Sequence, residues 1–319
     1  MRGWLAALAP GLVAAIAVAI GFAIDDQAAL IQQVQAMLFS GARLALAAWP
    51  VWALAGAVRT RKWRRHVSLG VLGGVLGGVP FGSWLGLGDI TGLRVASTNL
   101  DAFATEGADL EDALGAVDAD VLWTIERRAE AIPGMRRVAD NFDRDLQKPS
   151  WGLAAFCREG LTCRAWIADL VGHPSCPMPM GTVTVDDLCI LSLHLPPPVT
   201  VCNEGRDDYM EVVDDVLWGG RIARDVGTCT KGQRALVIGD LNSTPGMWIH
   251  RDLVARGFRD LFKWHGAWAS TWPAGGGYPK LPITQLDHAF AGETVAIEGV
   301  ETFAIPGSDH RGLLVGVAD

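Results

Sequence analysis

Six apolar segments of this chain adjoin side chains that can bind a metal ion or carry a proton. In RALVIGDLNSTP (234–245), an apolar run gives way to Asp240 and Asn242. An ionised side chain at the end of a buried strand is costly unless it is paired or liganded. The other five segments carry comparable residues at an end: Asn99, Glu126, His194, Asp287 with His288, and Asp309 with His310. Carboxylates and imidazoles bind metals and move protons, so one polar edge shared by these segments would be a reaction centre.

Each of these residues also has a purely structural explanation. Asn99 could cap the turn that follows it, and Asp240 and Asn242 are common turn formers. Asp287 and His310 could form a structural ion pair. Six such coincidences in one chain are much less probable than one, so their joint occurrence favours a site.

The segments that must position these residues read as strands with helices between them. Strands are expected at 93–100, 120–126, 186–195, 234–240, 285–291 and 312–318, with a hairpin over 151–168. Helices are expected at 107–117, about 204–226 and about 245–256, the last with Thr244 as its N-cap and Pro245 in its first turn. This alternation predicts an α/β layered sandwich.

The order of these motifs resembles that of the endonuclease/exonuclease/phosphatase superfamily, which has the DNase I-like fold. The matching segments are STNL, LWTIE, SLHLPPP, VIGDLNSTP, QLDHAF and GSDHRGLLV, and STWP (270–273) also resembles a family segment. The resemblance covers about residues 92–318. It implies a four-layer α/β/β/α sandwich that hydrolyses a phosphoester by metal-assisted, in-line attack of water.

The resemblance also implies a metal site. Glu126 is then the principal ligand of Mg²⁺ or Mn²⁺, with Asn99 and Asp309 nearby and Asp240 serving a second metal. Magnesium prefers oxygen ligands and keeps several waters, so one or two carboxylates are enough to hold it.

The remaining residues would carry the proton transfers. His310 with Asp287 behind it resembles a base and its orienting carboxylate, while other members of the family point to Asp240 as the base. Asn242 would donate a hydrogen bond to the phosphoryl oxygen, and His194 would bind the phosphate or protonate the leaving oxygen.

His194 has an acidic partner in some relatives. Glu159 is the candidate that the sequence offers for that partner. The acid role of His194 depends on finding it.

Three long apolar runs precede these segments and predict a membrane anchor. They cover residues 4–24, 37–58 and 67–88, and about 20 apolar residues suffice to cross a bilayer. A cleaved signal peptide would explain the first run alone, but two further runs follow it. The expected organisation is a three-helix anchor, 1–89, and a catalytic domain, 90–319.

The loops between the runs predict an orientation. The segment RTRKWRRH (59–66) carries five Lys or Arg residues, whereas DDQAALIQQVQ (25–35) is acidic and polar. Basic loops remain cytoplasmic. The third run would therefore deliver the catalytic domain to the periplasmic or extracytoplasmic side of the cell (inner) membrane.

The cysteines also indicate on which side of the membrane the catalytic domain lies. All six follow residue 90, and no CxxC spacing occurs, which argues against a zinc site. An even number in an exported domain suggests disulfides, and Cys157–Cys163 and Cys202–Cys229 are plausible pairs. Buried free thiols are the alternative.

Composition limits the substrate. Residues 90–319 hold 20 Lys and Arg against 32 Asp and Glu, a net charge of −12. Such a domain lacks the broad basic face of a strong nucleic-acid binder, although a local groove can differ. A nucleic acid is the favoured phosphodiester, with a phospholipid headgroup or a small phosphoester as the alternative. An inactive envelope scaffold is the third reading, and no obligate protein partner is inferred.

Tryptophans gather after the GDLN segment. Trp248, Trp264, Trp268 and Trp272 could stack on bases, but core packing is the favoured explanation.

Overall fold

The structure is a computed structural model that describes most of the C-terminal two thirds of the chain. The residues described are 16, 90–101, 108–127, 129–142, 152–170, 178–195, 197, 233–245, 247–264, 271–274 and 284–318. Within them, no helix is both long and apolar enough to cross a bilayer. Apart from residue 16, the three apolar runs lie outside these ranges, as do the helix expected at 204–226 and Trp268. The membrane anchor therefore stays a prediction.

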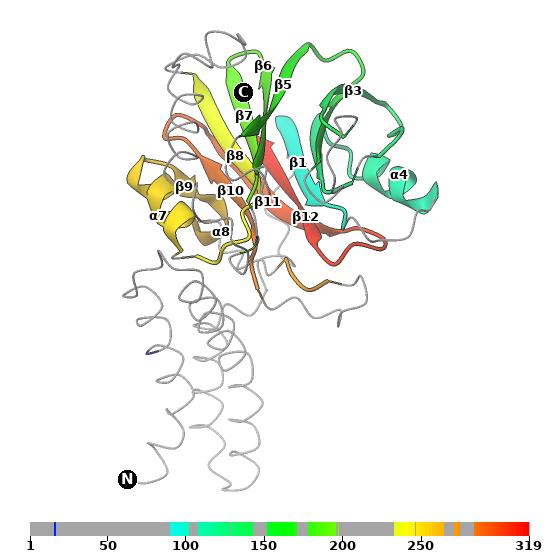
Figure 1. The fold of residues 1–319 in the computed structure, drawn as a ribbon. Helices are drawn as coiled ribbons and strands as arrows, with labels where there is room; N and C mark the ends of the chain where they lie inside the picture. Colours follow the sequence, from blue (N-terminus) through cyan, green and yellow to red (C-terminus); the bar gives the residue numbers. More distant parts are fainter. Residues whose placement is uncertain are drawn as a thin grey trace, which may run out of the picture.

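Two six-stranded mixed sheets face each other (Figure 1). The first has the order β11 (Ile297–Ala304), β12 (Arg311–Val317), β1 (Leu93–Asn99), β2 (Val121–Ile125), β4 (Leu153–Arg158), β3 (Met135–Asp140). The second has the order β5 (Cys163–Leu170), β6 (Met178–Val185), β7 (Leu188–His194), β8 (Arg234–Asp240), β10 (Asp287–Ala291), β9 (Arg259–Asp260). Apolar side chains of both inner faces form the central core.

Helices cover the outer faces of both sheets. Helix α4 (Ala108–Gly115) packs Leu110 and Leu114 against the first sheet. Helix α7 (Trp248–Ala255) packs Ile249 and Leu253 against the second, next to the short helix α8 (Leu261–Trp264). Figure 1 shows α4 on one flank and α7 with α8 on the other. The described residues thus confirm the predicted layered α/β sandwich with two central sheets.

Both sheets repeat one pairing pattern, and this pattern creates the site. Each has a central parallel pair, β1 with β2 and β7 with β8, flanked by antiparallel strands. The carboxyl ends of parallel neighbours lie at the same edge of a sheet. Strands β12 and β10 run antiparallel to these pairs, so their first residues lie at that edge too. Six polar strand ends therefore converge.

The hairpin expected over 151–168 is wrong. Strands β4 and β5 belong to different sheets, because β4 pairs with β2 and β3 whereas β5 pairs with β6. A turn signal between two apolar runs does not reveal whether the second run pairs back or crosses over. The predicted Cys157–Cys163 disulfide is present and joins the two sheets here.

The start of α7 also differs from expectation. Met247 is the N-cap residue, and it makes no side-chain capping bond. Thr244 instead donates its backbone N–H to the Met247 sulfur at 3.0 Å, and the Met247 N–H donates to the Thr244 carbonyl at 3.0 Å. Thr244 and Met247 are thus bonded to each other, and the helix begins at Trp248.

We expect the Cys157–Cys163 bond to stabilise the domain without affecting the site. The bond closes a short loop, with a sequence separation of 6. Chain entropy predicts that a Cys157→Ser/Cys163→Ser variant loses about 2 kcal/mol in its free energy of unfolding. Urea denaturation of the full chain in detergent measures this loss. Cys157 lies opposite Val121, at the far end of β2 from the site, so an altered kcat would contradict this prediction.

Candidate active site

Asn99 links the two sheets at the centre of the polar edge. Its amino group donates to the Glu126 Oε1 at 2.9 Å and to the Asp240 Oδ2 at 3.0 Å. The side-chain carbonyl oxygen of Asn99 (Oδ1) accepts the Asp101 N–H at 2.9 Å, which fixes the orientation of the side-chain amide. Two carboxylates, one beside each parallel strand pair, are thereby held around one amide. In this arrangement Asn99 presents its amino group rather than its oxygen to the carboxylates.

The backbone adopts positive φ angles near the points where the strands that carry the site residues end. Asp101, Glu126 and Asn242 have positive φ angles of 56°, 67° and 43°. Such conformations are uncommon outside glycine and gather at functional sites. Gly239 has a φ of 149°, and a Cβ there would lie 2.1 Å from the Leu193 carbonyl oxygen. Only glycine allows this close approach of β8 to β7.

Glu126, His194 and Asp240 form a first group that could hold a metal ion. One ligand atom from each lies within 4.8 Å of the others. The His194 Nε2 is 3.5 Å from the Glu126 Oε1, so Glu126 is an acidic neighbour of this histidine, as is Asp240. Glu159 is not, because it follows β4 at the opposite end of the sheet, where its N–H bonds to Gly134.

His310 and Asp287 form the dyad expected from the sequence. The His310 Nδ1 lies 2.8 Å from the Asp287 Oδ2, and both side chains are buried. The His310 Nε2 faces the centre of the site, 3.9 Å from both the Asp240 Oδ2 and the Asp309 Oδ1. Asp240, Asp287 and His310 form the second group of metal-capable residues within the described chain.

The electrostatics of these groups are dominated by burial and by excess carboxylate. Burial and the nearby Asp287 raise the pKa of Asp240 to about 6. Burial opposes the charged form of His310, but Asp287, Asp240 and Asp309 outweigh it and raise its pKa to about 10. Burial also raises the pKa of Asp309, with Asp101 and Glu126 adding to the effect. Crowded carboxylates beside the imidazoles of His194 and His310 suit a divalent cation.

Asn242 lies against Asp240. Its N–H donates to the Asp240 Oδ1 at 2.8 Å, and its amino group donates to the Leu195 carbonyl at 2.8 Å. The same amino group is 3.3 Å from the Asp240 Oδ2. Asn242 therefore shares the centre of the site with Asp240 and could offer this amino group to a phosphoryl oxygen only by exchanging a bond.

Three supporting residues were not predicted to have roles at the site. The Ser308 hydroxyl donates to the backbone carbonyl of Asn99 at 2.7 Å and accepts the backbone N–H of His310 at 2.9 Å. The Thr271 Oγ1 accepts the Asp287 N–H at 3.2 Å. Asp101 lies close enough to affect the pKa of Asp309. Thr271 and Ser308 do lie in the matching segments STWP and GSDHRGLLV, but a small hydroxyl or a turn aspartate does not by its type indicate a role at the site.

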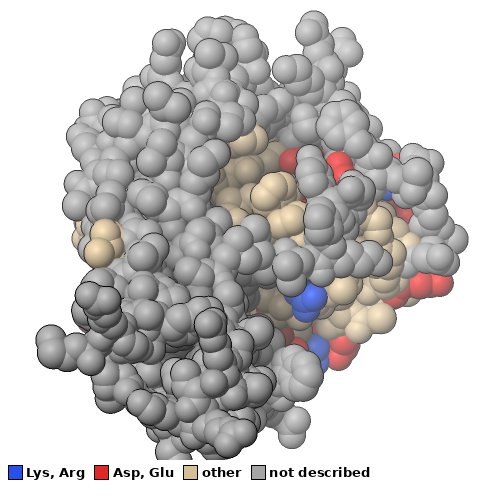
Figure 2. Space-filling view, turned by 90° about the horizontal axis from the view of Figure 1, so that it is seen from below, with Lys and Arg blue, Asp and Glu red and all other residues tan. Residues whose placement is uncertain are grey.

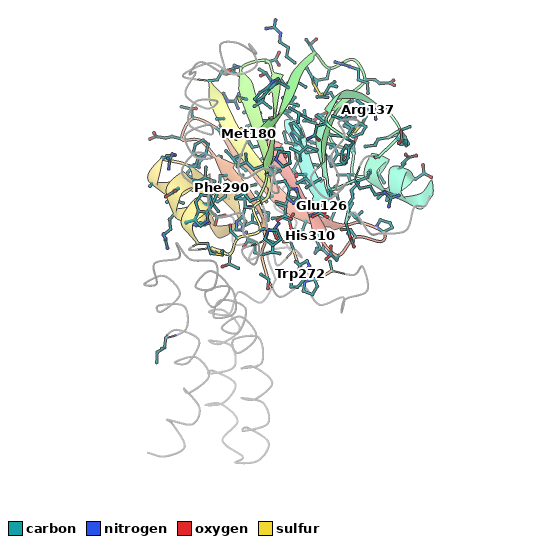
Figure 3. The ribbon with its side chains drawn as sticks, viewed as in Figure 1. Glu126, Arg137, Met180, Trp272, Phe290 and His310 are labelled. Carbon is teal, nitrogen blue, oxygen red and sulfur yellow. A yellow bond between two sulfur atoms is a disulfide. The ribbon has the colours of Figure 1, made fainter. Side chains whose placement is uncertain are left out.

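Trp272 lies at the rim of the site rather than in the core. Its indole N–H donates to the Asp309 Oδ2 at 2.9 Å, so Asp309 is held facing the site from that side. Figure 3 shows Trp272, His310 and Glu126 at the same end of the sheets. Asp309 belongs to neither group of three metal-capable residues in the described chain. Trp248, in contrast, is buried in the core as expected.

The raised pKa of His310 predicts how stability depends on pH. The folded protein holds a proton on His310 up to about pH 10, whereas the ordinary value is 6.5. This contribution to stability is complete below about pH 6.5 and is lost as the pH rises towards 10. The metal-free full chain should therefore melt at lower temperature as the pH increases over this window. Calorimetry in EDTA tests this, and an Asp287→Asn variant with an equally steep dependence would contradict it.

The chain is similar to several solved structures, and the first of those named here, with a TM-score above 0.5, supports the assignment of the fold. A Neisseria 3′ phosphatase solved with a product DNA hairpin is 13% identical, with a TM-score of 0.51 over 71% of this chain and 100% of its own. A mannosyl-6-phosphatase of Bacteroides thetaiotaomicron is 16% identical, with a TM-score of 0.47 over 71% and 100%. An endonuclease/exonuclease/phosphatase of Beutenbergia cavernae is 18% identical, with a TM-score of 0.48 over 70% and 71%. No curated protein sequence matches the chain.

A family model provides the decisive comparison. It describes the Endonuclease/Exonuclease/phosphatase family and matches residues 96–310. That range extends from β1 to His310 and contains every residue of the site described above. Members of such a family are hydrolases that act on phosphoester bonds. This chain belongs to the Endonuclease/Exonuclease/phosphatase family.

Proposed function

We propose that this protein is a membrane-anchored, divalent-metal-dependent phosphodiesterase that hydrolyses its substrate by attack of water. The observation that carries this proposal is the Asn99 amide, which holds Glu126 and Asp240 together beside the His310–Asp287 dyad. The favoured substrate is a nucleic acid.

The donor set fits a divalent cation. Glu126 and Asp240 supply hard oxygen atoms, and His194 supplies a nitrogen atom, within one group. Glu126 would hold the ion as its principal ligand, with Asn99 fixing the carboxylates of Glu126 and Asp240. Mg²⁺ or Mn²⁺ bound there would neutralise the charge that develops on the phosphate and lower the pKa of a bound water.

The protein's own residues would divide the proton transfers between Asp240 and His310. A group with a pKa of about 10 keeps its proton near neutral pH, so His310 would bind a phosphate oxygen as an imidazolium. Asp240, whose Oδ2 lies 3.9 Å from the His310 Nε2, would accept the proton of the attacking water. Asp287 holds the imidazole of His310 in a fixed orientation through the 2.8 Å hydrogen bond to its Nδ1. Asn242 and His194 would bind the remaining oxygens as charge builds on them.

The cellular location rests on the sequence and on the disulfides. The apolar runs and the basic loop 59–66 favour an inner-membrane anchor with an extracytoplasmic catalytic domain. The described cysteines are consistent with this, since Cys157 and Cys163 are bonded to each other and Cys189 is also in a disulfide. Disulfides persist in oxidising compartments.

A second candidate substrate is a phospholipid headgroup or another small phosphodiester. The observation that favours it is the net charge of −12 over residues 90–319. Figure 2 views the molecule from the end at which the site lies, and within the described part of this face the basic side chains occupy small, separate areas. A strong duplex binder would be expected to expose a more continuous basic surface.

One experiment tests the function and separates the substrates. The full chain, purified in detergent and stripped of metal, is assayed with and without Mg²⁺ or Mn²⁺ on DNA, RNA, bis-p-nitrophenyl phosphate and phospholipid vesicles. Metal-dependent hydrolysis supports the proposal, and the substrate cleaved fastest identifies the class. No hydrolysis of any of them by a folded, metal-binding protein would favour the inactive scaffold.

A further inference from the structure

His288 is a buried imidazole next to the site that none of the roles above uses. It follows Asp287 on β10, and neighbouring residues of a strand point to opposite faces of the sheet. Asp287 therefore points between the sheets, whereas His288 points outwards under α7. The side chain of His288 is fully buried, at 0% exposure.

The hydrogen bonds of His288 reach the loop that follows β8. The His288 Nε2 lies 2.8 Å from the carbonyl oxygen of Ser243, and its Nδ1 lies 3.3 Å from the Gln285 amide nitrogen. A carbonyl only accepts, so Nε2 carries the proton and Nδ1 accepts from Gln285. Burial lowers the pKa of His288 to about 4, which agrees with a neutral ring.

Packing leaves the ring of His288 little freedom to turn. Phe290 stacks on it, with ring centroids 5.8 Å apart and an interplanar angle of 22°. The ring of His250, from α7, meets it edge-on at 5.9 Å. His250 is itself fixed, because its Nε2 lies 2.8 Å from a buried Asp260 carboxylate oxygen. Figure 3 shows Phe290 on the α7 side of the second sheet.

The loop held in this way carries Asn242 and directly follows Asp240, the last residue of β8. Asp240 and Asn242 lie one to three residues before Ser243, and Asn242 has a positive φ of 43°. The Asn242 N–H and amino group bond to Asp240 and to the Leu195 carbonyl. A backbone in this conformation needs contacts that hold it there.

We infer that His288 is a positioning residue of the active site, whose Nε2–H, donated to the Ser243 carbonyl, holds loop 241–245 so that Asn242 and Asp240 face the substrate. Two adjacent residues of β10 then act on the site from opposite faces. Asp287 orients His310 directly, and His288 orients Asn242 through the backbone. This inference rests on the proposed phosphoesterase function.

Three substitutions of His288 separate its hydrogen bond from its packing. His288→Phe keeps a ring and removes the donor. His288→Gln keeps an N–H donor at the reach of Nε2, whereas His288→Asn keeps one only at the shorter reach of Nδ1. We expect the Phe and Asn variants to lose about 10- to 100-fold in kcat with little change in KM. The Gln variant should stay within about three-fold of the wild type.

A second readout does not depend on activity. Hydrogen–deuterium exchange of the metal-free full chain should show faster exchange in peptides covering 240–247 for the Phe and Asn variants, but not for the Gln variant. Exchange in β1 and β12 should be unchanged in all three. Phe290→Leu is the matched packing control, since it removes the stacked ring and leaves the donor in place.

The outcomes are distinct. A wild-type kcat in both His288→Phe and His288→Asn would overturn the inference. A Gln variant as impaired as the Asn variant, or Phe290→Leu as impaired as His288→Phe, would overturn it too, because packing alone would then explain the loss. If His288→Phe does not fold, the Gln and Asn pair still decides. An inactive wild type would refute the proposed function instead, while the exchange data would still test the loop.

Discussion

Replacing Glu126 with glutamine is expected to lower kcat/KM for a phosphodiester by about 10³-fold or more. Glu126 shares the Asn99 amide with Asp240 and lies in the first metal-capable group, so the change removes a charged oxygen ligand. A metal supplies several kcal/mol of transition-state stabilisation, and each 1.4 kcal/mol corresponds to about ten-fold in rate. Steady-state kinetics over a range of Mg²⁺ and Mn²⁺ concentrations measure the loss. Calorimetric titration with Mn²⁺ should show weaker binding in the same variant.

Glu159→Gln is the matched control for this prediction. It makes the same chemical change at an exposed residue at the opposite end of the sheets. We expect its kcat/KM and metal affinity to equal those of the wild type. Equal activity in Glu126→Gln and Glu159→Gln would show that the carboxylate of Glu126 does not take part in the reaction, and the metal site would have to be sought elsewhere.

Substitution of either member of the dyad is expected to produce the second large effect. Asp287→Asn and His310→Ala should each lower kcat by about 10²- to 10⁴-fold, as in other histidine–carboxylate pairs. Asparagine cannot hold the charge of the imidazolium, and it leaves the 2.8 Å contact to Nδ1 without its carboxylate. Residues that act as one unit give non-additive losses. The double variant should therefore be no more than a few-fold slower than His310→Ala.

The protein contains its own control for the dyad. His250 and Asp260 form a second buried pair with the same 2.8 Å separation, on the outer side of the second sheet. Asp260→Asn should lower the melting temperature and leave kcat within a few-fold of the wild type. A loss of kcat in Asp260→Asn as large as that in Asp287→Asn would show that the loss is not specific to the dyad of His310 and Asp287. Additive losses in the Asp287→Asn/His310→Ala variant would also argue against one unit.

The site shows why the order of motifs was informative in the sequence. Asn99, Glu126, His194 and Asp240 each end an apolar strand or follow it directly. Strand period and turn chemistry are local properties, so the strands that bear these residues were predictable to within a few residues. The prediction that these residues meet at one edge of the sheets came from the number of polar strand ends and from their order along the chain.

Strand pairing was not local and was predicted less well. Strands β3, β6, β9 and β11 were missed, and β5 was assigned to a hairpin with β4. Strand β3 is mostly exposed or half-buried, so its sequence lacks the apolar alternation of a central strand. Strand β5 belongs to the second sheet because it pairs with β6, and the sequence of the turn at 159–162 carries no information about that pairing.

The sequence by itself determined which residues could do chemistry, since their types and their places at strand ends are local. Only the tertiary structure decided which of them meet. It paired His194 with Glu126 rather than Glu159, and it attached Trp272 to Asp309. It also gave Asp287 and His288, adjacent in sequence, different partners, because the two faces of β10 pack against different layers. Contacts across layers depend on the order of strands in both sheets, and no single segment carries that information.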